Sequence, residues 1–561
     1  MAPNAFHRML ASSPARRNAL VALLVCCASL LAWQRLAAQQ PRPRPVIVIG
    51  FDGADAAFTE KWMDEGKLPN LARLRQMGTY RPLTPTLPAQ TPVSWSTFAT
   101  GIDPGRTGIF DFLRRDPKTY MPVFAAFEEI TEPVLFGERN AVVIPLIAFA
   151  ALFAILFLVL KLVRRPLRTA AIAAGATALI GAAVVWVVVD RYVPEKRPGV
   201  INRREGIPMW DVVSAAGLRA KVVQVPVTFP ATDLEGGHML SGLGVPDMSG
   251  RIGKPFYFTS ELDLKTGGSN EFSIEVVQLE DNRGVIQTEI VGPPNRLFGD
   301  PPFIAQPMTI TVADDRQSIE ITLGEQRLRL RAGEWTDWVE LTFKFNPLVS
   351  VKGISRFHLI SVQPEVQLYL SPINFDPENL PPGFRISTPP QWAGELAEKH
   401  GRYKTMGWAI DTWAISEGFA NEQMFWDDME WTVKQFRSLY QQFLAEDDDL
   451  LVQQFEFTDR VGHVFWRFMD PEHPAYDAEL AAKWGDGLLK SYQIMDAIVG
   501  EAMEAADREN AALIVLSDHG FATWRRSINY NTWLVQNGYL ALRSGVETGD
   551  RNLEILFDSG E

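Results

Sequence analysis

The chain has 561 residues, of which 47% are hydrophobic, and it carries a formal net charge of −13 at pH 7. This length exceeds what one simple core needs, so we expect a large catalytic domain with inserted elements. The negative charge argues against general nucleic-acid binding, which relies on Lys and Arg to neutralise phosphates. An anionic substrate would therefore need a local source of positive charge, such as bound divalent cations.

An apolar stretch near the N-terminus, NALVALLVCCASLLAW, comes after the basic pair Arg16 and Arg17. It predicts a signal peptide cleaved near Ala38 or a short signal anchor, and either would export the rest of the chain. Cys26 and Cys27 lie inside this stretch, so they form neither a disulfide framework nor a zinc knuckle. A stiff proline linker, PRPRP, ends this leading part of the chain, residues 1–44.

The segment VIVIGFDG, which comes after the linker, predicts a buried parallel strand with Asp52 at its C-terminal end. Residues 221–227, 450–459 and 511–520 give similar strand patterns, and helical patterns separate them. This alternation predicts an α/β domain with a mainly parallel sheet flanked by helices.

The segment PTLPAQTPVSWSTFATG predicts a helix that begins near Thr91, continues through Thr100 and ends at Gly101. Thr91 would then place a hydroxyl at the positive end of a helix, where an alkoxide and a phosphate are both stabilised. On this segment alone, a simple helix-capping role for Thr91 is the favoured interpretation.

Two uncharged apolar stretches, 141–160 and 170–189, are each long enough to cross a bilayer. The alternative is a pair of buried core helices, which are rarely apolar on every face over this length. The short connection between the stretches is basic and predicts a cytoplasmic turn; its cations are Lys161, Arg164, Arg165 and Arg168. Gly175, Gly181 and many alanines would let the second span pack closely on the first.

This membrane hairpin, residues 138–192, would interrupt the exported domain. We expect the catalytic α/β domain to comprise 45–137, 193–252 and 376–561. Residues 253–375 contain short alternating apolar and polar runs, such as SIEITL and WVELTFKF, broken by turn residues. They predict a β-rich insert.

Three of the predicted strands lead into acidic or imidazole side chains, and parallel sheets bind ligands beyond the carboxyl ends of their strands. Asp459 and His463 are four residues apart, so one helical turn would let them share a cation. Asp518 and His519 are adjacent. An isolated strand-end Asp is more often a cap or turn residue, and a lone His is more often structural. Mixed oxygen and nitrogen ligands favour zinc, with manganese or iron as alternatives.

The order FDG, then TPVSWSTFATG with DPGRTGIFDF, then DRVGH and SDHGF, resembles the type I phosphodiesterase/nucleotide pyrophosphatase branch of the alkaline phosphatase superfamily. The likeness extends over about 45–125, 200–250 and 385–545. It implies an alkaline-phosphatase-like fold and a Thr or Ser nucleophile between two metal ions. By this resemblance, Thr91 is the nucleophile, and its oxygen shares one metal ion with Asp52, Asp518 and His519. Asp459 and His463 would hold the other ion.

The sequence departs from the family pattern at two places. The family supplies one more histidine to the second ion from beyond the SDHG motif, whereas His519 is the last histidine here. We therefore expect the sequence to be partial rather than naturally short of this ligand. Pro92 has no N–H for a phosphate oxygen. Ser94 could donate to phosphate instead, could be an alternative nucleophile, or could simply be a helix-surface serine.

The leading hypothesis is a membrane-anchored phosphodiesterase or pyrophosphatase that uses two divalent ions and a phospho-threonine intermediate. Its substrate would be a nucleotide-like or lipid-linked phosphodiester, and its catalytic domain would lie on the periplasmic side of the inner membrane. One alternative is a transferase that passes a phospho-head-group to lipids or glycans. The other is a catalytically impaired, phosphatase-like binding protein.

Overall fold

The computed structural model describes residues 43–541, apart from 121, 263–273, 524, 527, 529 and the side chain of 531. The predicted signal segment and the end of the chain lie outside the described residues. The chain divides into two units at Pro45, and all named helices and strands belong to the second unit, which begins at Val46.

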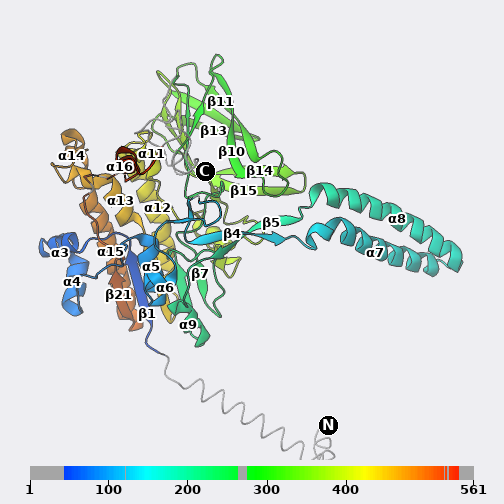
Figure 1. Cartoon of the computed structure of the whole chain (residues 1–561), viewed down its shortest axis with the longest axis horizontal. Helices are drawn as coiled ribbons and strands as arrows, with labels where there is room; N and C mark the ends of the chain where they lie inside the picture. Colours follow the sequence, from blue (N-terminus) through cyan, green and yellow to red (C-terminus); the bar gives the residue numbers. More distant parts are fainter. Residues whose placement is uncertain are drawn as a thin grey trace, which may run out of the picture. The chain divides into compact units, whose positions relative to one another are not determined.

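A six-stranded sheet forms the framework of the domain, in the order β19-β7-β6-β20-β1-β21 (Figure 1). Its strands are β1 (Val46–Phe51), β6 (Ala220–Val223), β7 (His238–Leu240), β19 (Ser387–Thr388), β20 (Leu450–Phe455) and β21 (Ala512–Leu516). β19 runs antiparallel to β7, and the other neighbours are parallel. Every residue of β6 and β20 is buried, as expected for strands covered on both faces. The mainly parallel sheet predicted from the sequence is therefore confirmed.

Different helices cover the two faces of this sheet because side chains alternate along each strand. Ile47 and Ile49 of β1 face one core cluster, and Val48 faces another. The first cluster takes side chains from α3 (Ala56–Asp64), α4 (Pro69–Met77), α10 (Trp392–His400), α12 (Glu422–Phe443), α13 (Phe457–Phe465) and α15 (Gly487–Glu509). The second takes Trp95 from α5 (Thr91–Thr100) and Trp210 from α9 (Met209–Ala215).

Shorter helical segments connect these elements. They are α6 (Pro104–Thr107), η1 (Gly137–Arg139), α11 (Trp413–Ser416), η2 (Trp466–Phe468), α14 (Ala478–Trp484) and α16 (Tyr530–Gln536).

The β-rich part of the chain forms three further sheets around a core of its own, which includes Phe258, Ile310 and Leu341. The first is β10-β11-β12-β13: β10 (Val285–Pro294), β11 (Phe303–Val312), β12 (Ser318–Leu323) and β13 (Gln326–Arg331). The second is β14-β15-β18: β14 (Val339–Asn346), β15 (Val349–Ser355) and β18 (Asn374–Phe375). The third is β16-β17-β8-β9: β8 (Phe256–Thr259), β9 (Glu275–Gln278), β16 (Phe357–Ser361) and β17 (Gln367–Leu370).

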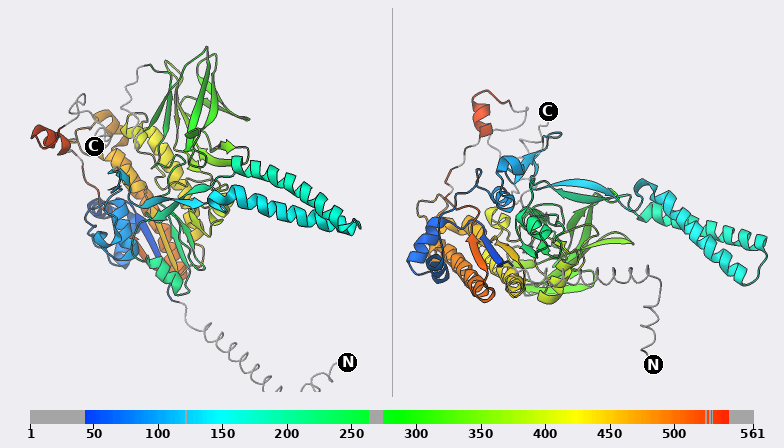
Figure 2. Two further views of the ribbon diagram at one scale, coloured as in Figure 1. Left: turned by 45° about the vertical axis from the view of Figure 1, so that its right-hand side comes forward. Right: turned by 90° about the horizontal axis from the view of Figure 1, so that it is seen from below.

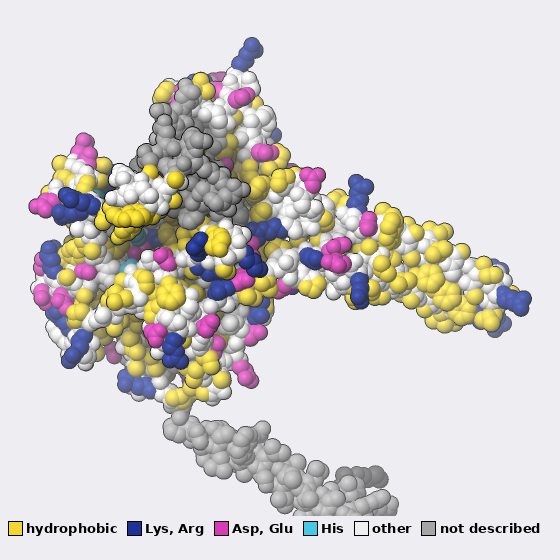
Figure 3. Space-filling view, in the orientation of Figure 1, with side chains coloured by type: hydrophobic (Ala, Val, Ile, Leu, Met, Phe, Trp, Pro, Cys, Tyr) yellow, Lys and Arg dark blue, Asp and Glu magenta, His cyan; other side chains and the backbone are white. Residues whose placement is uncertain are grey.

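Two long apolar helices, α7 (Asn140–Leu162) and α8 (Leu167–Tyr192), lie side by side in both views of Figure 2. Both are long and apolar enough to cross a membrane. On the face seen in Figure 3, hydrophobic side chains line both helices, and cations lie at the tip of the hairpin. Ala170, Ala174, Ala178 and Ala182 recur every four residues and are the buried face of α8. A Cβ added at Gly181 would come within 2.6 Å of Leu152, so small residues permit this close approach.

One antiparallel pair of strands connects the helical hairpin to the domain, and a second pair comes just before it in the chain. β4 (Phe127–Pro133) leads into α7, and β5 (Lys196–Asn202) leaves α8 and pairs with β4. β2 (Leu113–Arg115) and β3 (Pro122–Phe124) form the second pair.

Two predicted strands are shorter than their apolar runs suggested. β6 ends at Val223, because Gln224 and Val227 adopt left-handed backbone conformations with φ of 58° and 60°. β20 ends at Phe455, and Glu456 already has the helical conformation that starts α13. Asp459 therefore lies in the first turn of a helix and not at the end of a strand, as the predicted strand over 450–459 implied.

Candidate metal centre

Three neighbouring strands bring the candidate ligands to one edge of the sheet. Asp52 directly follows β1, and Asp518 follows β21 by two residues. α13, which carries Asp459, begins two residues after β20. Because β1 lies between β20 and β21 and all three are parallel, their carboxyl ends meet.

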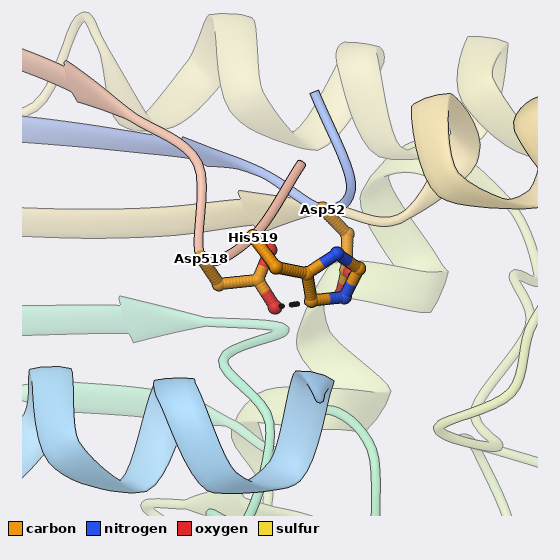
Figure 4. Close-up of side chains that lie close together, drawn as sticks. All are labelled: Asp52, Asp518 and His519. Atoms are coloured by element: carbon orange, nitrogen blue, oxygen red, sulfur yellow. Dashed lines mark ion pairs between the residues drawn. The ribbon is translucent and has the colours of Figure 1, made fainter. Parts of the chain in front are cut away.

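Asp52, Asp518 and His519 converge beyond these strand ends (Figure 4). One ligand atom from each lies within 4.8 Å of the others, a spacing that could hold a metal ion. His519 Nε2 is 3.4 Å from Asp52 Oδ1 and 3.5 Å from Asp518 Oδ2. The backbone N–H of Gly53 donates to the other Asp518 oxygen at 3.2 Å, which fixes the carboxylate in place.

Thr91 lies against this group at the start of α5. Its hydroxyl donates to Asp52 Oδ1 at 3.1 Å and lies 3.3 Å from His519 Nε2. The helix begins at Thr91 and ends at Gly101, with φ of 68°, as the sequence predicts. No side chain caps its first turn, so the positive end of the helix dipole lies beside the hydroxyl.

Ser94 is also buried, but its hydroxyl has a different partner. It lies 2.8 Å from the hydroxyl of Thr86, in the loop before α5. This contact orients Ser94 toward Thr86, whereas Thr91 contacts two candidate ligands directly.

Asp459 and His463 form a second pair on α13, with His463 Nε2 3.5 Å from Asp459 Oδ2. Asp459 is buried, and the His463 side chain is 56% exposed. This pair lies close to the first group, because Asp459 packs against Gly53, the neighbour of Asp52. A Cβ added at Gly53 would lie 2.9 Å from the Asp459 Cβ. Gly53 also has φ of 64°, so glycine is favoured here for both space and conformation.

The carboxylates of this site are difficult to ionise without a cation. Burial raises the pKa of Asp52 well above its usual range, and the nearby Asp518 and Asp459 raise it further. Burial, opposed in part by the Gly53 hydrogen bond, raises the pKa of Asp518 to about 8. Asp518 Oδ2 is buried and accepts no hydrogen bond. Buried, like-charged oxygens of this kind are suited to a divalent cation, and the added imidazole favours zinc or manganese.

Two side chains near the ligands were not predicted as part of the site. Gln454 of β20 donates to Asp52 Oδ2 at 3.0 Å. Arg460 is buried, with Nη1 3.4 Å from Asp459 Oδ2 and with Glu456 as its second partner. Its guanidinium stacks 3.6 Å above the Trp408 ring. The sequence offered two signals for these side chains. Gln453 and Gln454 form a polar pair within the apolar run LLVQQF, and Arg460 directly follows the candidate ligand Asp459.

Comparison with known proteins gives one match. The family model described as Type I phosphodiesterase / nucleotide pyrophosphatase matches residues 46–273 and 375–557, more than half of the chain. The unmatched interval lies in the β-rich part. No curated protein and no solved structure matched the chain.

Proposed function

Because the chain belongs to the type I phosphodiesterase/nucleotide pyrophosphatase family, we propose that it hydrolyses phosphodiester or phosphoanhydride bonds through a phospho-threonine intermediate on Thr91. The observation that carries this proposal is the position of the Thr91 hydroxyl, which contacts Asp52 and His519 at a positive helix end. The mainly parallel sheet, with its ligands at the carboxyl edge, supports an alkaline-phosphatase-like fold.

We propose that Asp52, Asp518 and His519 hold one divalent ion, and that Asp459 and His463 contribute to a second. When bound, the two ions supply positive charge that lowers the pKa of the nucleophile and stabilises the attacking and leaving oxygens. The chain's own contribution begins with orientation. Gln454 and Gly53 each fix a carboxylate by donating a hydrogen bond, and the Thr91 hydroxyl is held toward Asp52.

In the first step, Thr91 loses its hydroxyl proton and Oγ1 forms a bond to phosphorus. The bond from phosphorus to the leaving oxygen breaks, and that oxygen takes up a proton. In the second step, water attacks phosphorus, the bond to Thr91 Oγ1 breaks, and Thr91 regains its proton. The N-terminal end of α5 stabilises negative charge on the transferred group in both steps.

We further propose that α7 and α8 anchor the domain in the plasma membrane, with the catalytic domain on the extracytoplasmic side. The basic connection between the helices supports this orientation, since short cytoplasmic loops are rich in Lys and Arg. The exposed apolar surface of both helices supports insertion in lipid rather than in a protein core.

A direct test measures hydrolysis of bis(p-nitrophenyl) phosphate by the purified full chain in detergent, with and without zinc or manganese. We expect metal-dependent turnover, its loss in Thr91→Ala, and partial retention in Thr91→Ser. Mass spectrometry of the quenched reaction should detect a p-nitrophenyl phosphoryl group on Thr91, because only one of the two p-nitrophenolate groups leaves in the first step. Full activity of Thr91→Ala would overturn the assignment of the nucleophile.

A transferase is the second candidate, because the hairpin lies within the catalytic domain and would bring the site to lipid-linked acceptors. Turnover that requires an added alcohol or lipid acceptor would favour it over a hydrolase. The third candidate is a binding protein, because the second predicted ion site has only two ligands, Asp459 and His463, among the described residues. Fewer than one bound zinc per chain, together with no turnover, would favour that alternative.

A further inference from the structure

The junction between the strand pair β4–β5 and the helical hairpin is tied together by one buried side chain. Asn140, the first residue of α7, donates to the carbonyls of Val134 at 2.9 Å and Pro194 at 3.2 Å. Its side-chain carbonyl accepts the backbone N–H of Phe136 at 2.9 Å. The chain entering α7 and the chain leaving α8 are therefore held at one point, so the hairpin is fixed relative to β4 and β5.

Two apolar side chains project from this junction. Leu135 is 72% exposed and Phe136 is 48% exposed. Leu135 also has φ of 55°, a conformation that non-glycine residues rarely adopt. A strained backbone that exposes neighbouring apolar side chains points to a contact outside the domain.

The β-rich part of the chain reaches the same junction. Asn346, at the turn between β14 and β15, donates to the carbonyl of Tyr192, the last residue of α8, at 3.3 Å. The Asn346 side-chain carbonyl accepts the N–H groups of Leu348 and Val349 at 2.8 and 2.9 Å, so the turn is well ordered. Leu348 lies at its tip and is 63% exposed.

The length of α8 indicates the depth of this turn in a bilayer. The helix has 26 residues and is therefore about 39 Å long, whereas the hydrocarbon core is about 30 Å thick. The uncharged stretch of α8 ends at Val189, so Tyr192, which comes after the charged residues Asp190 and Arg191, would extend beyond the core into the headgroup layer. Trp186 is 49% exposed near this end, and Trp and Tyr are typical of that interface. Exposed charges of both signs lie near the junction in the chain: the cations Arg139, Arg191 and Lys344, and the acids Glu138, Asp190 and Glu195. Such a mixed polar border suits zwitterionic headgroups.

We propose that Leu135, Phe136 and Leu348 form a collar that enters the headgroup layer of the bilayer around the hairpin. The occupant of this surface is phospholipid, because the collar continues the exposed apolar surface of α7 and α8 and is bordered by charged side chains. The β14–β15 turn would then give the β-rich part its own membrane contact. This inference depends on the proposed membrane insertion of α7 and α8, and it adds a second point of attachment.

Nitroxide quenching in lipid nanodiscs tests the collar. The full chain with Cys26→Ala and Cys27→Ala would carry a fluorophore at a single introduced cysteine, in phosphatidylcholine with phosphatidylglycerol. Leu348→Cys reports on the collar. Ala151→Cys, exposed in the middle of α7, reports on the hairpin, and Glu325→Cys, exposed in the turn between β12 and β13, is the control away from it.

We expect the label at residue 348 to lose most of its fluorescence with headgroup or shallow-chain nitroxides and less with deep-chain nitroxides. The label at residue 151 should show the opposite depth preference, and that at residue 325 should be unaffected. Equal, weak quenching at 348 and 325, with strong quenching at 151, would overturn the collar and leave the hairpin intact. Absence of quenching at 151 would overturn both. Quenching at 348 by aqueous iodide alone would show that this surface faces solvent.

Discussion

Binding of a metal ion at Asp518 should release a proton, because this buried carboxyl has a pKa of about 8 without an ion. At pH 7 it is then about nine-tenths protonated, and an ion can bind only the ionised form. We expect about one proton to leave Asp518 for each ion bound at pH 7, with a further contribution from Asp52, whose pKa is also raised. Apparent affinity should increase about tenfold or more per pH unit below 8 and level off above it.

Calorimetric titration of zinc into the metal-free full chain, in two buffers with different ionisation enthalpies, measures this proton release. The Asp518→Asn variant is the control, and it should release fewer protons and bind more weakly. Release of less than about half a proton at pH 7, or affinity that does not change from pH 6 to 8, would refute the reasoning.

The same shift predicts how stability without metal depends on pH. When the pKa of a carboxyl is higher in the folded protein than in the unfolded chain, the carboxyl contributes stability that is fully present below its unfolded pKa. That stability is lost as the pH rises through its folded pKa. A rise from 3.8 to about 8 corresponds to about 6 kcal/mol. Without metal, the unfolding free energy should therefore fall between about pH 4 and 8, and bound metal should reduce that fall.

Three substitutions test other parts of the structure. Ser94→Ala should lower kcat/KM by less than about tenfold, because the substitution removes one neutral hydrogen bond, to Thr86, and keeps the proposed nucleophile Thr91. Abolished turnover would show that Ser94 is essential. Arg460→Met should weaken the affinity of the Asp459 metal site by about 10–100-fold, with partial rescue by lysine, as measured by competition with a chelator; unchanged affinity would contradict a positioning role. Gly50→Ala should lower the unfolding free energy by about 1–3 kcal/mol or more, because its Cβ would lie 2.1 Å from the buried Trp95 ring, and urea denaturation measures this loss.

Sequence patterns located the candidate ligands because each pattern is local. The apolar run before Asp52 predicted a parallel strand, and parallel strands present their carboxyl ends at one edge. The four-residue spacing of Asp459 and His463 anticipated a shared helix face, and both lie on α13. The family resemblance supplied the roles, and the family itself is confirmed by the match over the catalytic parts.

Contacts between distant segments could not be predicted in this way. Gln454 contacts Asp52, 402 positions away in the chain, only because β20 pairs with β1. The end of β20 was also predicted too far along the chain. Phe455 and Phe457 continue the strand-like pattern, whereas the backbone is already helical at Glu456. Likewise, alternating patterns predicted strands in the β-rich part but not that β8 pairs with β17.

The position of β1 between β20 and β21 also determines the order of events as the protein is made. Val46 must pair with Leu450 and Ala512, so β1 emerges from the ribosome long before the two strands that flank it. Both hairpin helices are complete long before then, and they can enter a membrane while β1 still has neither neighbour. Such distant pairing slows folding and leaves strand edges open to wrong partners. A chain released before about residue 520 would therefore contain α7 and α8 but not the assembled group of Asp52, Asp518 and His519.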